Sequence, residues 1–138
     1  MINEDLLALI KYRIEQADEA LNDAAVLVER ESFRAAVNRA YYAMFYSVLA
    51  LLSVDGKETS KHSGAISLFD IDFIRSGRID KTFSTWLHEV FEDRLRSDYK
   101  PLVIITRQVA EDGLDHARAF VAQVKIYLAE NIGPLNAN

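Results

Sequence analysis

The chain has 138 residues, of which 50% are hydrophobic and 27% are charged, with five glycines, two prolines and no cysteine. This composition fits one globular domain over residues 1–138 and excludes a disordered chain, a collagen-like repeat and a disulfide-stabilised secreted module. The net charge of -5 argues against a protein that coats nucleic acid through a uniformly basic surface. Residues 57–107 nevertheless carry nine basic and eight acidic side chains, which leaves room for a local basic site.

The sequence has no targeting or membrane-spanning signal. No basic segment followed by an apolar run stands near the amino terminus, so we predict no signal peptide. The longest uncharged stretch, residues 40–54, is interrupted by three tyrosines and two serines. Crossing a bilayer takes about 20 apolar residues. This stretch therefore predicts a buried helix, and we expect a cytoplasmic protein without membrane association.

The first two predicted elements are long helices. Apolar residues at alternating steps of three and four predict an amphipathic helix over about residues 4–31, with Asn3 as its N-cap. Such a helix would be roughly 42 Å long at ~1.5 Å per residue, which indicates an elongated bundle. Ser32 is expected to cap a second helix with an unusually wide apolar arc, and Asp55-Gly56 should end it.

Two shorter helices should follow. The third is predicted near residues 61–75 and should end at Ser76-Gly77. Asp80 is in place to cap the fourth helix. We expect that helix to end near residues 97–99, because Pro101 disfavours helical geometry at the preceding residue.

The last helix is predicted over about residues 104–130 and closes at Gly133-Pro134. No segment shows the alternation of a β-strand. Four to five helices with mostly short connections predict an all-α fold, an antiparallel up-and-down bundle.

Most familiar catalytic motifs are absent. The sequence has no glycine-rich phosphate loop and no cysteine nucleophile. His62, His88 and His116 lie in three different predicted helices, and a metal site made from them would require the three to converge. We therefore predict no metal site and no cofactor.

The first candidate segment lies in the second helix. Tyr42 and Tyr46 follow Arg39 by three and seven residues, so the three side chains share a helix face. A guanidinium in a core-forming helix needs an acidic partner or a ligand, because an unpaired buried charge is expensive. One interpretation is an internal salt bridge with tyrosines at the edge of the core. The other is an anion or nucleotide contact with aromatic stacking.

The second candidate segment ends the fourth helix. Arg94, Arg96 and Lys100 are three basic residues in seven, with Tyr99 among them, and this combination suits a phosphate. The structural alternative is a solvated helix face. Arg94 and Asp98, four residues apart, would there form a surface pair worth only ~0.3 to 0.5 kcal/mol.

The third candidate segment begins the third helix. Thr59, Ser60 or Ser63 stands where exposed backbone N–H groups favour an anion, and Lys61 and His62 would add charge or proton transfer. In the structural alternative, Ser60 caps the helix and His62 lies on the surface.

Together these segments resemble the HEPN domain superfamily, specifically its small stand-alone bacterial and archaeal members. The matching pieces are residues 39–46, residues 60–64 and residues 94–99, and the resemblance covers about residues 4–130. It implies an all-helical domain that is usually a homodimer. Such domains are often encoded beside a minimal nucleotidyltransferase, as a toxin and antitoxin pair.

The resemblance also implies a chemistry. Catalytic members of the superfamily are metal-independent endoribonucleases, in which an arginine stabilises phosphate charge and a following histidine moves a proton. Arg94 matches that arginine, but Tyr99 stands at the histidine position. Tyrosine has an unperturbed pKa of ~10, against ~6.5 for histidine, so Tyr99 would be a poor base that can still orient a phosphate. His62 would supply the proton shuttle if the third helix starts near Arg94.

Three hypotheses follow. The leading one is a homodimeric HEPN-type bundle that binds a nucleotide or RNA without strong catalysis. The second is a metal-independent endoribonuclease of a toxin-antitoxin pair, and the third is a module that binds a second copy or a nucleotidyltransferase. Each site hypothesis requires His62, Arg94 and Tyr99 to face one recess. The candidate catalytic residues are Arg94, Tyr99 and His62, and the candidate ligand-binding residues are Arg39, Tyr42, Lys61 and Arg96.

Overall fold

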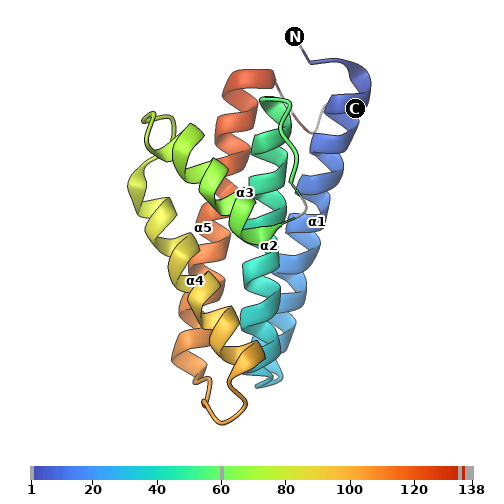
Figure 1. Cartoon of the computed structure of the whole chain (residues 1–138). Helices are drawn as coiled ribbons and strands as arrows, with labels where there is room; N and C mark the ends of the chain where they lie inside the picture. Colours follow the sequence, from blue (N-terminus) through green and yellow to red (C-terminus); the bar gives the residue numbers. More distant parts are fainter. Residues whose placement is uncertain (1, 60, 134, 136–138) are drawn as a thin grey trace.

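The computed structural model describes residues 2–59, 61–133 and 135, and it confirms the predicted all-helical bundle. No described residue lies in a strand. The elements in chain order are α1 (Glu4–Glu29), α2 (Phe33–Val54), α3 (His62–Phe69), the π-helical turn η1 (Asp70–Ile74), α4 (Lys81–Tyr99) and α5 (Arg107–Ile132). In Figure 1, α1, α2, α4 and α5 run up and down the long axis, and the short α3 lies between α2 and α4 in the chain.

Helix α2 is the centre of the bundle. Thirteen of its 22 residues are buried, compared with six of the 26 residues of α1. It contacts all four other helices, which explains the wide apolar arc in its sequence. The site-forming residues of α2 are therefore held by packing on several sides.

The ends of α1 and α2 follow local signals. Asn3 caps α1 as predicted, because its side-chain oxygen accepts a hydrogen bond of 2.8 Å from the Leu6 amide. The helix ends at Glu29, two residues before the predicted end, and Glu31 takes a left-handed conformation with φ +62°. Ser32 occupies the N-cap position of α2 as predicted but makes no capping hydrogen bond with its side chain.

The third predicted helix differs from the observed one. It is an α-helix only to Phe69, and the chain then widens into the π-turn, where the Arg75 amide donates to the Asp70 carbonyl. Phe69 and Phe73 are both buried across this change. The apolar spacing therefore stays the same while the hydrogen-bond register shifts by one residue.

The last two helices begin at side-chain caps. Asp80 caps α4 as predicted by accepting from the Thr82 amide at 2.8 Å, and the helix ends at Tyr99 within the predicted range. Helix α5 begins three residues later than predicted, because Thr106 serves as its N-cap and accepts from the Val109 amide at 3.2 Å. Gly133 ends it with φ +96°, and Pro134 lies outside the described residues.

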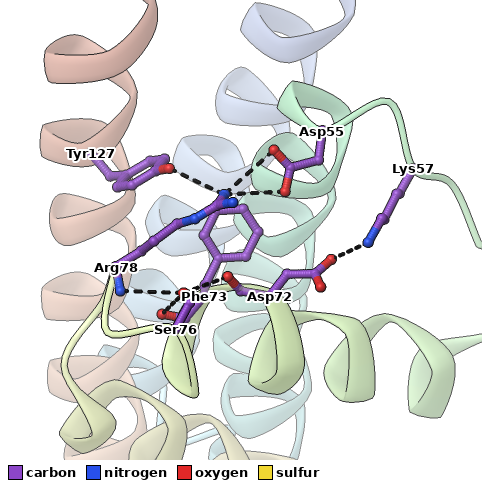
Figure 2. Close-up of polar contacts among 7 residues, drawn as sticks. All are labelled: Asp55, Lys57, Asp72, Phe73, Ser76, Arg78 and Tyr127. Atoms are coloured by element: carbon purple, nitrogen blue, oxygen red, sulfur yellow. Dashed lines mark hydrogen bonds and ion pairs between the residues drawn. The ribbon is translucent and has the colours of Figure 1, made fainter.

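One polar network fixes the end of the bundle where α2 turns toward α3 (Figure 2). Arg78 donates to the two carboxylate oxygens of Asp55 at 3.2 and 3.4 Å and to the Tyr127 hydroxyl at 3.5 Å. Its guanidinium also lies 5.0 Å from the centre of the Phe73 ring. Lys57 pairs with Asp72 of the π-turn at 2.5 Å. These contacts connect α2, the π-turn and α5, and they constrain the loop that leads to α3.

None of the helices in the described part of the chain combines the length and the apolar character that crossing a membrane requires.

Candidate functional site

Two arginines from different helices meet at the Tyr42 ring. The guanidinium carbon of Arg39 lies 4.9 Å from the ring centre, and that of Arg94 lies 5.7 Å from it. Arg94 is also 5.4 Å from the centre of the Tyr41 ring. These distances allow cation–π attraction. The first two candidate segments, 55 residues apart in sequence, thus form one cluster on α2 and α4.

Arg94 is largely buried and only partly satisfied. Its side chain is 14% exposed, and its Nε lies 2.9 Å from Asp98 Oδ2, so the two residues pair but not on the solvated surface that the structural alternative assumed. The carboxylate oxygen lies off the N–H direction, so the contact is an ion pair and the buried Nε–H has no hydrogen-bond acceptor. Asn38 holds the same carboxylate by a long contact of 3.5 Å.

Arg39 has no acidic partner among the described residues. No carboxylate lies within ion-pair distance of it, and its buried Nε–H also lacks an acceptor. The internal salt bridge considered from the sequence is therefore not found here. Asp98 pairs with Arg94, whereas Arg39, which lines a small pocket together with Glu15, Glu19 and Asp23, forms no ion pair with a described residue.

His62 joins this cluster from the first residue of α3. Its Nδ1 lies 2.8 Å from the Tyr41 hydroxyl, and its ring stacks on Phe45 at 4.1 Å between centres. Burial lowers the pKa of His62 below its ordinary value, and the nearby charge of Arg94 lowers it further. Burial also raises the pKa of Tyr41, against the opposing effect of Arg94. At neutral pH the imidazole is therefore neutral and the phenol keeps its proton.

The start of α3 and the end of α4 lie on the same side of the bundle. Arg94 contacts the Tyr41 ring, whose hydroxyl binds His62, and it lies 6.0 Å from the centre of the Tyr99 ring. Tyr99 is 68% exposed at the mouth of this arrangement. The structure thus brings His62, Arg94 and Tyr99 to one region, while the common recess and their roles stay predictions.

Two candidate residues lie apart from this cluster. Arg96 is rotated from Arg94 by roughly 200° around α4. It is paired with Asp93 at 3.5 Å and is 47% exposed. Lys61 is exposed at the N-cap of α3, and no side-chain contact joins it to a described residue of the cluster. Both lie beside candidate residues in sequence, but a helix places such neighbours on different faces.

The turn at the start of α3 is held by Thr59, Lys61 and Gly64. Ser60 lies outside the described residues, and the N-cap is Lys61, whose amide donates to Thr59 Oγ1 at 3.2 Å. A Cβ atom at Gly64 would come within 2.9 Å of that same oxygen. The glycine therefore preserves the turn that presents His62.

An open groove of about 1210 Å³ adjoins the cluster. Its polar side includes Asn38, Arg39, Tyr42 and Asp98, and its apolar side includes Phe33, Val103 and Ile105. Arg34 donates to the backbone carbonyls of Ser97 and Val103, which holds the α4–α5 loop against α2. The groove extends the site beyond a phosphate-sized recess.

Sequence reasoning missed three residues of the site. Tyr41 and Phe45 read as part of the apolar arc of α2, and only the position of α3 shows that both contact His62. Arg34 precedes Asn38 by four residues, so extending the polar face of α2 backward would have found it.

The other histidines have separate partners. His88 Nε2 lies 2.7 Å from Asp70, and His116 stacks on Trp86 at 4.7 Å between ring centres. Within the described ranges, no group of three or more His, Asp or Glu residues gathers as a metal site would require.

Comparison with known proteins assigns this arrangement to a family. The family model of the HEPN domain matches residues 10–127, which contain every candidate site residue. The chain belongs to the HEPN domain family. A protein of Thermotoga maritima named "UPF0332 protein" is 36% identical over 85% of this chain and 89% of its own length.

Two proteins of Methanocaldococcus jannaschii carry the name "Putative toxin". One is 35% identical over 94% of this chain and 96% of its own length. The other is 33% identical over 83% of this chain and 78% of its own length.

Proposed function

We propose that this HEPN domain binds a phosphate group of a nucleotide or RNA at Arg39, Tyr42, His62, Arg94 and Tyr99, without strong catalysis. The observation that carries the proposal is the meeting of two guanidinium groups at one aromatic ring: each has a buried Nε–H without a hydrogen-bond acceptor, and Arg39 forms no ion pair with a described residue. A bound anion would supply the missing countercharge. The exposed Tyr99 ring offers a surface on which a base can stack.

Titration calorimetry with adenosine monophosphate, short single-stranded RNA and inorganic phosphate tests this proposal. We expect Arg39→Ala and Arg94→Ala each to weaken binding about tenfold or more, because a charge-assisted contact is worth ~1.5 to 3 kcal/mol. Arg118→Ala is the matched control, since Arg118 is 55% exposed on α5 and, among the described residues, pairs with Asp115. Equal affinity in wild type and Arg94→Ala, or no binding in wild type, would remove the proposal.

A second candidate is a metal-independent endoribonuclease acting as a toxin. The name of the two archaeal relatives and the meeting of Arg94, His62 and Tyr99 favour it. Cleavage of single-stranded RNA should then persist in a chelator and be lost in Arg94→Ala. Tyr99→His is the informative variant, because it places an imidazole at the position of the superfamily histidine. RNA left intact by wild type and by Tyr99→His contradicts this candidate.

A third candidate is a module for protein association, and the α4–α5 loop favours it. Leu102 and Ile104 are 95% and 82% exposed, and Ile104 itself lines the groove together with Phe33, Val103 and Ile105. A protruding apolar loop beside an apolar groove on the same chain suits a two-fold symmetric homodimer.

Light scattering after gel filtration should show a dimer for wild type and a monomer for Leu102→Asp. Ile126→Asp, 52% exposed on α5, is the control. A wild-type monomer contradicts the homodimer. Co-purification with a co-expressed minimal nucleotidyltransferase tests the pairing that the resemblance implies.

A further inference from the structure

The donor and the acceptor of the hydrogen bond between Tyr41 and His62 follow from burial. The Tyr41 side chain is 0% exposed, and its hydroxyl has one hydrogen-bond partner among the described residues, His62 Nδ1 at 2.8 Å. A buried O–H group needs an acceptor, and leaving a donor unsatisfied is unfavourable. If Nδ1 carried a proton, the phenol O–H could point toward it, and two donors would then face each other. It could also point away, and the phenol proton would then have no acceptor. Tyr41 therefore donates and Nδ1 accepts.

The imidazole ring is held in this orientation from several sides. Phe45 stacks on it with 17° between the ring planes, and Tyr42 meets it edge to face at 5.5 Å between centres. The charged and titratable groups that face it are Arg94 from α4 and the two phenols of α2, with Lys61 next in the chain. The positive charge of Arg94 disfavours an imidazolium, so the ring is neutral with its proton on Nε2.

From this geometry we infer that Tyr41 is a positioning residue that makes His62 a fixed hydrogen-bond donor, through Nε2–H, in the anion site. The inference rests on the proposed phosphate binding for its functional meaning. A neutral imidazole has one lone pair on a ring nitrogen, and here Tyr41 engages it. His62 can then donate to a phosphate oxygen but has no lone pair with which to accept a proton from a 2′-hydroxyl. Tyr41 thus favours binding over cleavage at this site.

The protonation state of His62 can be read directly by NMR. Protein labelled with ¹⁵N in histidine gives long-range ¹H–¹⁵N correlations that distinguish the two neutral tautomers and the imidazolium. We expect the wild-type spectrum at neutral pH to show His62 as the Nε2–H tautomer alone. In Tyr41→Phe, which keeps the ring and removes the hydroxyl, we expect a mixture of tautomers and protonation of His62 at a higher pH.

Internal controls are present in the same spectra. His88 and His116 pair with Asp70 and Glu89 and have no contact with Tyr41, so their signals should not change in Tyr41→Phe. A proton on Nδ1 in wild type, or a His62 spectrum that is unchanged in Tyr41→Phe, would overturn the inference.

Affinity for adenosine monophosphate gives the functional readout. Tyr41→Phe should weaken binding by about two- to tenfold, the value of one hydrogen bond, because Arg39 and Arg94 stay in place. Tyr127→Phe, which removes an α5 hydroxyl that contacts Arg78, is the matched control and should bind as wild type does. If wild type fails to bind the nucleotide, the proposed function is wrong while the tautomer result still stands. If wild type binds and Tyr41→Phe binds equally well, the positioning role is wrong.

Discussion

Arg39→Met should make this protein more stable while removing part of its binding site. Methionine is close to arginine in length and keeps a contact with the Tyr42 ring, but it carries neither the charge nor the buried Nε–H that has no acceptor. An unsatisfied buried donor costs ~1 to 3 kcal/mol. The lost cation–π contact is worth ~0.5 to 1 kcal/mol, and a sulfur–aromatic contact returns ~0.3 to 1.5 kcal/mol. The expected net gain in the free energy of unfolding is centred on about 2 kcal/mol.

Urea unfolding followed by circular dichroism measures this difference. The midpoint should rise in Arg39→Met without a change in the slope of free energy against urea concentration, because the surface exposed on unfolding is nearly the same. Arg118→Met, at an exposed position of α5, should change stability by less than about 0.5 kcal/mol. A loss of about 1 kcal/mol or more in Arg39→Met would refute the reasoning, because it would show that the free protein already satisfies the Arg39 guanidinium.

Three further predictions concern single side chains. Arg78→Ala should lower the free energy of unfolding by about 1 kcal/mol, since it removes an exposed ion pair with Asp55 and the contact with the Phe73 ring; an unchanged thermal midpoint contradicts this. The pKa of His62 is lowered by burial, so the unfolded state binds the proton more readily and stability should fall as pH drops below about 6.5. His62→Gln should reduce that slope, and an identical slope would count against it. Burial raises the pKa of Asp93, so its ionised form destabilises the fold as pH rises through that value. Asp93→Asn should therefore raise the melting temperature at pH 7 but not in acid, and a gain equal at both would disagree.

Helix ends and helix faces could be predicted from this sequence because their causes are local. Asn3 and Asp80 cap their helices through side-chain oxygens that need only the next few residues. The apolar stripe of α1 likewise follows the repeat of an α-helix, which does not depend on any other helix. The π-turn could not be found in this way. Phe69 and Phe73 keep the spacing of an α-helix, and the change concerns backbone hydrogen bonds that side-chain patterning does not encode.

The same distinction holds for the candidate site: features set within one helix could be predicted, and contacts between helices could not. The shared face of Arg39 and Tyr42 follows from three-residue spacing, but the bond between Tyr41 and His62 depends on how α3 lies against α2, which no local pattern determines. Arg96 was predicted to belong to the site because it is close to Arg94 in sequence. The rotation of the helix separates the two side chains, and Arg96 pairs with Asp93 instead. The candidate site is marked by a conflict between the packing of a helix and the charge that it carries. Helix α2 faces the core, yet it carries a guanidinium without an acidic partner among the described residues. Natural sequences tolerate such conflicts mainly where function requires them, which is why the unsatisfied arginines support the proposed ligand site more strongly than any motif does.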